Sequence, residues 1–164
     1  MYPPSWFDGG QYGFDVAIYP YVKSKQVYSC PSNPLHISDW PGYHTMGVGP
    51  IPRSYAMNGD ISIESGRKIL VLEPSVDRPS ETILMLETSD YYRPQGPDHE
   101  TYVGNRNDVC YHIPFKIHQG GANYIFCDGH AKWARVEQTW SWWRRDHKEL
   151  GPPENLCAKR QQGG

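Results

Sequence analysis

Residues 118–134 read HQGGANYIFCDGHAKWA, and this stretch decides the fold. Within it, residues 122–127 and 130–134 are short runs rich in aliphatic and aromatic side chains, a composition typical of β-strands. They are separated by Asp128-Gly129, a dipeptide that favours tight turns with positive φ angles. The stretch therefore predicts a β-hairpin with a two-residue turn at Asp128-Gly129.

The segments that precede the hairpin supply further strands. Residues 82–87 (TILMLE) contain four consecutive aliphatic side chains and leave no polar face, which predicts a central strand buried on both sides. Residues 53–58 predict a strand that ends at the turn dipeptide Asn58-Gly59, and residues 26–30 alternate like a strand up to Pro31. We expect an antiparallel sheet.

Two segments have helical character. Residues 15–22 predict a short helix or turn interrupted at Pro20. After the hairpin, apolar residues recur at the spacing of one helix face, and Gly151 follows as a stop signal. These residues are Val136, Trp140, Trp143, His147 and Leu150. The sequence thus predicts an α+β fold in which a C-terminal helix packs its indole rings on the sheet.

Composition limits the class of protein. The 164 residues include 16 Gly and 15 Pro, which argues against a helical bundle and favours long loops. The length fits one domain, which we assign to residues 1–153, with an irregular aromatic arm at 1–14 and a flexible tail at 154–164. A net charge of −2 makes nucleic acid an improbable partner. The longest aliphatic runs have four residues, far short of the ~20 that span a bilayer.

The cysteines are widely spaced and form no C-x-x-C pair, which disfavours a zinc ribbon or a thioredoxin-like site. They are Cys30, Cys110, Cys127 and Cys157. An even number fits disulfides in an oxidising compartment, although three pairings are possible. The alternative is four buried or partly buried thiols, because a cysteine thiol packs as a small hydrophobic group.

Histidines and an aspartate around the hairpin form a candidate metal site, composed of His112, His118, Asp128 and His130. Imidazole and carboxylate groups are common ligands of zinc and related metals, so a metal-dependent hydrolase is one hypothesis. The structural alternative is stronger, because Asp128 suits a tight turn and the glycines permit an unusual backbone. The sequence contains no nucleophile elbow, P-loop, zincin or dinucleotide-binding motif.

Other acidic residues have both a chemical and a structural interpretation. Glu87, at the end of the buried strand, could act as a general acid or base, or it could bond to loop amides or to an arginine. The loop carboxylates Asp90, Asp98, Glu100 and Asp108 offer oxygen ligands for calcium, although their spacing matches no EF-hand. Solvated loop charge is the stronger interpretation of these four, so we expect no cofactor.

Aromatic side chains are candidates for an interface between subunits or for a ligand-binding surface that recognises a glycan or peptide. The candidates are Tyr2, Trp6, Tyr91, Tyr92, Trp140, Trp142 and Trp143. The alternative is that these side chains belong to the core.

The chain resembles a bacterial family of type IV pilin-like, or pseudopilin-like, proteins with an H-X9-DG motif. The motif corresponds to His118, nine residues, and then Asp128-Gly129, with Gly120, Gly121 and Asn123 between them. Three further segments match in order: PYVK with VYSCPS at residues 20–32, SYAMN at residues 54–58, and PSETILMLE at residues 79–87. Together the matches span residues 20–133.

The resemblance implies an α+β head with an antiparallel sheet, a location outside the cell or in its envelope, and a structural role in a secretion apparatus or pilus-like filament. Members of the family usually begin with a long hydrophobic helix, and we expect this chain to be the head alone. The resemblance implies a structural role for His118, Asp128 and Gly129, and no enzyme. We therefore predict a non-catalytic filament subunit that associates with itself or with similar subunits, with an extracellular glycan- or peptide-binding module as the alternative and a metal-dependent hydrolase as the second alternative.

Overall fold

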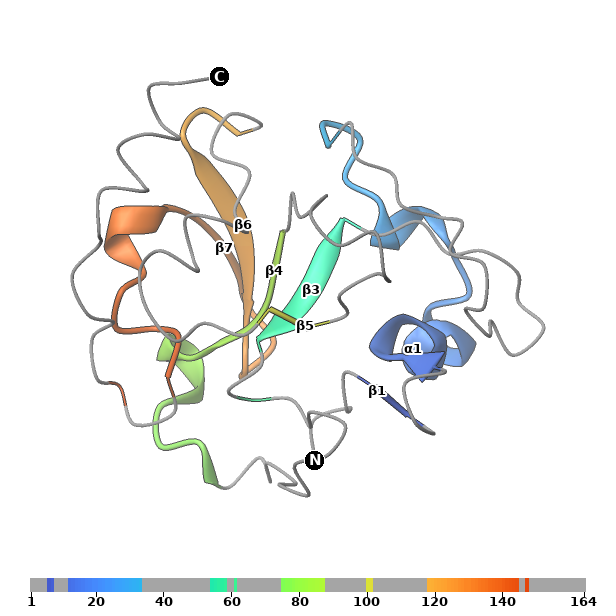
Figure 1. Cartoon of the computed structure of the whole chain (residues 1–164), viewed down its shortest axis with the longest axis horizontal. Helices are drawn as coiled ribbons and strands as arrows, with labels where there is room; N and C mark the ends of the chain where they lie inside the picture. Colours follow the sequence, from blue (N-terminus) through green and yellow to red (C-terminus); the bar gives the residue numbers. More distant parts are fainter. Residues whose placement is uncertain are drawn as a thin grey trace.

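The computed structural model describes residues 6–7, 12–33, 54–58, 61, 75–87, 100–101, 118–144 and 147 (Figure 1). Several residues singled out in the sequence lie outside this part of the chain: Tyr2, Asp90, Tyr91, Tyr92, Asp98, Asp108, Cys110, His112, Leu150, Cys157 and the whole of 154–164. Among the described residues, no helix has the length and apolar character needed to cross a membrane.

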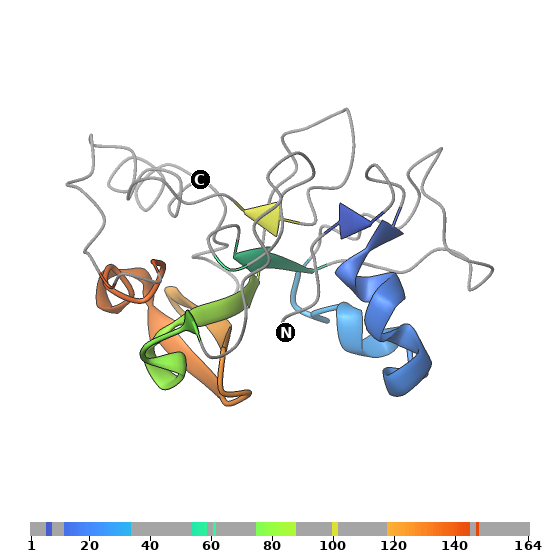
Figure 2. The same cartoon turned by 90° about the horizontal axis from the view of Figure 1, so that it is seen from below.

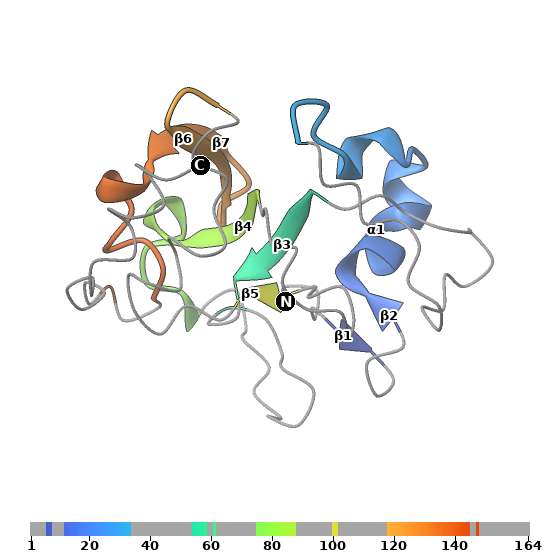
Figure 3. The ribbon, with the colours of Figure 1, turned by 45° about the horizontal axis from the view of Figure 1, so that its top comes forward.

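A five-stranded sheet forms the centre of the fold, in the order β5-β3-β4-β6-β7. Its strands are β3 (Tyr55–Asn58), β4 (Ile83–Glu87), β5 (Glu100–Thr101), β6 (Gly121–Phe126) and β7 (Ala131–Arg135). Strands β3, β4, β6 and β7 pair antiparallel, whereas the short β5 lies parallel to β3 (Figure 3). The predicted α+β class is confirmed, and the sheet is antiparallel except at β5. Strand β4 is central, as its aliphatic run predicts, but it is not buried throughout, because Leu84 and Met85 are only half-buried.

The β6–β7 hairpin is confirmed, but its turn differs from the predicted one. Three residues, 127–129, connect the strands, because the Gly129 N–H donates to the Phe126 carbonyl and the Phe126 N–H donates to the His130 carbonyl, both at 2.9 Å. Only Gly129 has a positive φ, of 92°, whereas Asp128 does not. This pattern is that of a type I turn followed by a glycine in the left-handed region. The predicted two-residue turn is therefore wrong by one residue.

The main core lies on one face of the sheet and is closed by the segment after β7. Trp143 is fully buried there, and its ring meets that of Tyr124 edge-on with centroids 6.0 Å apart. The predicted C-terminal helix is wrong: Val136–Gln138 forms a short 3₁₀ turn (η5), followed by turns and bends through residue 144. The Trp142 and Trp143 carbonyls accept hydrogen bonds from the Ile83 N–H and the Asn58 amide, both at 2.8 Å. A helix would direct these carbonyls along its own axis.

The N-terminal part contains helix α1 (Phe14–Val22), at the opposite side of the molecule from the β6–β7 hairpin (Figure 2). The predicted interruption at Pro20 does not occur, since the helix runs through it. Residues 26–30 are not a strand, because Gln26–Tyr28 forms a 3₁₀ turn (η2) in which the Ser29 N–H bonds back to the Gln26 carbonyl. The predicted irregular arm contains two short paired strands, β1 (Trp6–Phe7) and β2 (Tyr12–Gly13).

Candidate functional site

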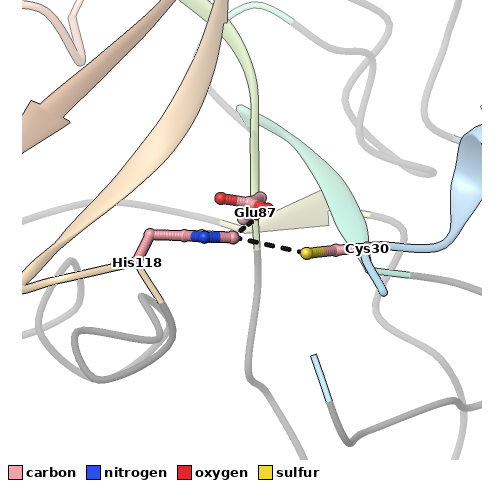
Figure 4. A group of neighbouring side chains, drawn as sticks. All are labelled: Cys30, Glu87 and His118. Atoms are coloured by element: carbon pink, nitrogen blue, oxygen red, sulfur yellow. Dashed lines mark hydrogen bonds and ion pairs between the residues drawn. The ribbon is translucent and has the colours of Figure 1, made fainter. Parts of the chain in front are cut away.

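Three polar side chains from distant parts of the chain meet where β4 ends beside the start of β6 (Figure 4). Cys30 follows η2, Glu87 is the last residue of β4, and His118 precedes β6. The Nε2 atom of His118 lies 2.9 Å from Oε1 of Glu87 and 3.3 Å from Sγ of Cys30. The candidate site is therefore one compact cluster of nitrogen, oxygen and sulfur donors.

Glu87 is the most buried member of the cluster, with an exposed fraction of 1%. Besides the contact with His118, its Oε2 atom accepts hydrogen bonds from the backbone N–H of Asn123 at 2.7 Å and from the Asn123 amide at 3.1 Å. Removing a carboxylate from water is costly unless donors replace the lost hydration. These three donors provide that replacement.

The backbone before β6 brings His118 back toward the sheet. Gln119 and Gly120 adopt positive φ angles of 58° and 86°, so the chain turns sharply and His118 forms a bridge with Gly121. The indole N–H of Trp133 donates to the His118 carbonyl at 2.9 Å. A side chain at Gly121 would lie 2.5 Å from the Ala134 carbonyl oxygen and 2.6 Å from the Trp133 ring, so only glycine fits there. The Gly-Gly pair therefore sets the position of His118.

Cys30 is held by Ser54, the residue that directly precedes β3. Its N–H donates to the hydroxyl of the buried Ser54 at 2.9 Å, and the Ser54 N–H donates to the Tyr28 carbonyl at 2.8 Å. Burial raises the pKa of the Cys30 thiol, and the hydrogen bond with Glu87 raises it further. Burial, together with the negative charges of Glu87 and Cys30, raises the pKa of the neighbouring Tyr55 to about 12. The site thus disfavours additional negative charge.

The geometry limits the chemistry that the cluster can perform. A thiol–imidazole–carboxylate relay uses the two ring nitrogens of histidine for different partners. Here the same atom, Nε2 of His118, contacts both the sulfur and the carboxylate. The raised pKa of Cys30 also opposes formation of the reactive thiolate. What the arrangement offers instead is a hydrogen-bonded link between three segments and a set of metal-ligating atoms.

The histidine–aspartate group predicted from the sequence is not brought together. His118 lies at the beginning of β6, whereas Asp128 and His130 lie beyond its other end and pair with each other at 2.6 Å on the exposed hairpin turn. The strand between them keeps the two ends apart, and His112 lies outside the described residues. The proposed four-residue metal site therefore has no counterpart in the part of the chain that the structure describes.

Other sequence predictions have mixed outcomes. Trp143 is fully buried and Trp140 and Trp142 pack against the same core, so these indoles belong to the interior as the alternative interpretation predicts. Trp6 is described only by its backbone, in β1. The large apolar side chains that are exposed in the described ranges are Tyr21, Val22, Val27 and Trp133. Cys30 and Cys127 are buried thiols, and neither takes part in a disulfide in the described ranges.

The sequence did not reveal the partners of the site. Glu87 bonds to an amide as its structural interpretation predicts, but the amide belongs to Asn123 in β6 and not to a loop. Cys30 and Ser54 were not connected to His118, since 88 residues separate the cysteine from the histidine. The available signal was the ordered set of motif segments, each of which contributes at least one residue to the cluster or to its support.

The chain was compared with known proteins, and no family model, curated protein or solved structure matches it.

Proposed function

We propose that the protein is a non-catalytic structural subunit, the pseudopilin-like head of a filament or secretion apparatus outside the cell or in its envelope. The observation that carries this proposal is that the four motif segments bond to one another. Residues that are far apart in the sequence, but that belong to the resembling segments, form a polar network around Cys30, Glu87 and His118, and Asn58 makes two further hydrogen bonds separate from it. Such a network explains why these residue types would recur together in a family without any catalytic role.

Three sets of hydrogen bonds connect the segments, and the contact between Cys30 and His118 at 3.3 Å joins the first set to the second. The first joins Cys30 to Ser54, from the CPS and SYAMN segments. The second joins Glu87, at the end of the TILMLE strand, to His118 and Asn123 of the H-X9-DG motif. The third is Asn58, whose amide donates to the Ile83 carbonyl at 2.8 Å and to the Trp143 carbonyl at 2.8 Å. Each link fixes one segment against its neighbour in the sheet, which is a structural task.

Two further motif residues, Asp128 and Gly129, serve the hairpin turn. Gly129 takes the positive φ that ends the turn, and the Asp128 carboxylate accepts hydrogen bonds from the His130 N–H at 3.1 Å and ring at 2.6 Å. An aspartate that bonds the backbone two residues later is a common turn-forming device. This conformational role supports the proposal.

Self-association is the property to test. We would examine the purified protein by electron microscopy over a range of concentrations, together with a mass measurement of its oligomeric state. Regular filaments or concentration-dependent oligomers are expected. A protein that stays monomeric at every concentration would contradict the proposal.

A variant can locate the contact surface. Tyr21 and Val27 are 87% and 53% exposed, and exposed apolar side chains favour burial between subunits. We expect the double substitution Tyr21→Ser and Val27→Ser to weaken association without altering the circular dichroism spectrum. Gln26→Ser, an exposed polar neighbour, is the matched control and should associate like the unaltered protein.

A further inference from the structure

The cluster at the end of β4 combines three types of metal-ligating atom. Cys30 offers a sulfur, His118 a ring nitrogen and Glu87 a carboxylate oxygen, and all three ligand atoms lie within 4.8 Å of one another (Figure 4). Cys30 and Glu87 are buried, with exposed fractions of 4% and 1%. Sulfur, imidazole and carboxylate together are the ligands that zinc takes in proteins.

Two of the three donor separations lie close to the edges of a tetrahedral site. With zinc bonds of about 2.3 Å to sulfur and about 2.0–2.1 Å to nitrogen or oxygen, ligand atoms at tetrahedral angles lie roughly 3.3–3.6 Å apart. The observed separations are 3.3 Å from sulfur to nitrogen and 2.9 Å from nitrogen to oxygen, and all three donor atoms lie within 4.8 Å of one another. Small side-chain rotations that widen the nitrogen–oxygen edge and bring Sγ and Oε1 to the tetrahedral separation would accommodate the ion.

We propose that Cys30, Glu87 and His118 form a binding site for a thiophilic divalent cation, with Zn²⁺ as the preferred ion and water as the fourth ligand. The water would lie on the side of His118, whose side chain is 21% exposed. The proposal goes beyond the structural role of the protein, which does not depend on it.

Charge and proton balance favour this ion. A thiolate, a carboxylate and a neutral imidazole together neutralise a charge of +2, so the loaded site carries no net charge in its buried position. Binding releases the thiol proton of Cys30 to solvent. The hydrogen that Nε2 of His118 donates to Glu87 before the metal binds is replaced by one on Nδ1, so the neutral ring directs its Nε2 lone pair to the metal.

The neighbours of the three ligands already hold them in place. Asn123 donates two hydrogen bonds to Oε2 of Glu87, which leaves Oε1 directed toward His118. Ser54 fixes the backbone of Cys30, and Trp133 fixes the backbone of His118. Contacts of this kind orient metal ligands and increase their affinity. A metal in this position would connect segments that are 88 and 31 residues apart in the sequence.

Cobalt provides the direct test, because Co²⁺ occupies zinc sites and a Co²⁺–thiolate bond gives a charge-transfer absorption in the near ultraviolet. The full chain, purified without metal-affinity tags and freed of metals, would be titrated with Co²⁺ and then with Zn²⁺. We expect the thiolate band to saturate at one Co²⁺ per protein and to disappear when one equivalent of Zn²⁺ is added. Proton release into a weakly buffered solution should accompany binding.

Variants assign the band to this cluster. Cys30→Ser and His118→Gln should abolish the band or reduce the affinity for Co²⁺ at least about tenfold. Cys127→Ser removes the other buried thiol of the described ranges, and His130→Gln removes the exposed imidazole of the turn. Both control variants should bind Co²⁺ like the unaltered protein.

Two results would overturn the proposal. One is the absence of a thiolate band in the folded, unaltered protein at excess Co²⁺, which requires no variant and is independent of variant folding. The other is a band of unchanged strength in Cys30→Ser, which would assign the bound metal to a different cysteine. Neither result would affect the self-association experiment, so failure of the metal site and failure of the structural role can be distinguished.

Discussion

Each end of β6 has a histidine paired with a carboxylate. The two pairs share their chemistry but differ in burial and in the segments that they connect. Glu87 and His118 meet at 2.9 Å with side-chain exposures of 1% and 21%. Asp128 and His130 meet at 2.6 Å with exposures of 35% and 42%. The shorter distance belongs to the more exposed pair. Distance alone is therefore a poor guide to how much either pair stabilises the fold.

Burial and connectivity explain the difference. The Glu87 carboxylate has three protein donors and bonds to a histidine 31 residues away, so its loss would leave polar groups unsatisfied and two segments unconnected. The Asp128 carboxylate bonds within its own turn to a residue two positions later, and solvent can replace either partner. The buried pair organises tertiary structure, whereas the exposed pair shapes one turn.

The largest expected effect comes from removing the buried carboxylate. Glu87→Ala should lower the free energy of unfolding by about 3 kcal/mol, because the Asn123 and His118 donors lose their acceptor. Glu87→Gln retains an acceptor oxygen and the side-chain volume, so its loss should be smaller. Urea unfolding followed by circular dichroism measures both. If Glu87→Ala lowers the free energy of unfolding no more than Asp128→Ala does, the buried pair does not contribute more to stability than the exposed pair.

The glycines at the two ends provide the next comparison. A Cβ on Gly121 would meet the Ala134 carbonyl and the Trp133 ring, so Gly121→Ala should cost about 2 kcal/mol through overpacking. Gly129 has a φ of 92° but open space around it, so Gly129→Ala should cost about 1 kcal/mol through backbone strain alone. Thermal unfolding of both variants tests the order. Equal losses would show that the crowding at Gly121 is relieved by movement of its neighbours.

Alkaline pH should lower the free energy of unfolding through Cys30, at the buried end of β6. The pKa of Cys30 is raised above its ordinary value of 9.0 in the folded state, so its contribution to stability is complete below that pH. The contribution disappears as the pH rises toward the higher pKa of the folded state, since the unfolded chain loses the proton first. Denaturant unfolding on both sides of pH 9.0 should show this decline. The decline just above pH 9.0 should be shallower in Cys30→Ser.

The smallest expected effect is at the exposed turn. The hydrogen bond from the His130 backbone, followed by the His130 side chain, holds the pKa of Asp128 below its ordinary value of 3.8. A lowered pKa means that Asp128 stabilises the fold above pH 3.8 and that this contribution disappears as the pH falls through the folded-state pKa. Asp128→Asn should produce only a slight loss at neutral pH and none in strong acid. A loss at neutral pH equal to that of Glu87→Ala would contradict this expectation.

Local signals in the sequence predicted four strands of the sheet, β3, β4, β6 and β7, but they missed the short parallel β5 and predicted a strand at residues 26–30 where the chain forms a 3₁₀ turn. The hairpin and the central strand β4 follow from alternation, a turn dipeptide and an aliphatic run, all of which are properties of neighbouring residues. The prediction of a C-terminal helix is wrong because the structure of this segment depends on residues that are distant in the sequence. Its apolar spacing is genuine, but the Trp143 carbonyl bonds to Asn58, 85 residues away, which a periodic pattern cannot reveal. Tertiary contacts override helical periodicity here.

The candidate site was predictable only in part. His118, Asn123 and Glu87 were each singled out, whereas the pairing of His118 with Glu87 and Cys30 depends on how the chain crosses the sheet. The predicted grouping of His118 with Asp128 and His130 relied on their closeness in sequence. Strand β6 lies between them and holds them at its opposite ends. Closeness in sequence is therefore a weak indicator of a shared site when an extended element lies between the residues.

The long span between Cys30 and His118 has a consequence for the order of folding. The β6–β7 hairpin closes through residues that are almost adjacent, and hairpins form within about 1–10 μs. Contacts between residues 88 positions apart must first overcome the entropy of closing a long loop, so we expect the Cys30 segment to dock late. Until it docks, the thiol remains accessible to oxidants. The rate of docking, more than the depth of final burial, then decides how many newly made chains escape oxidation at Cys30.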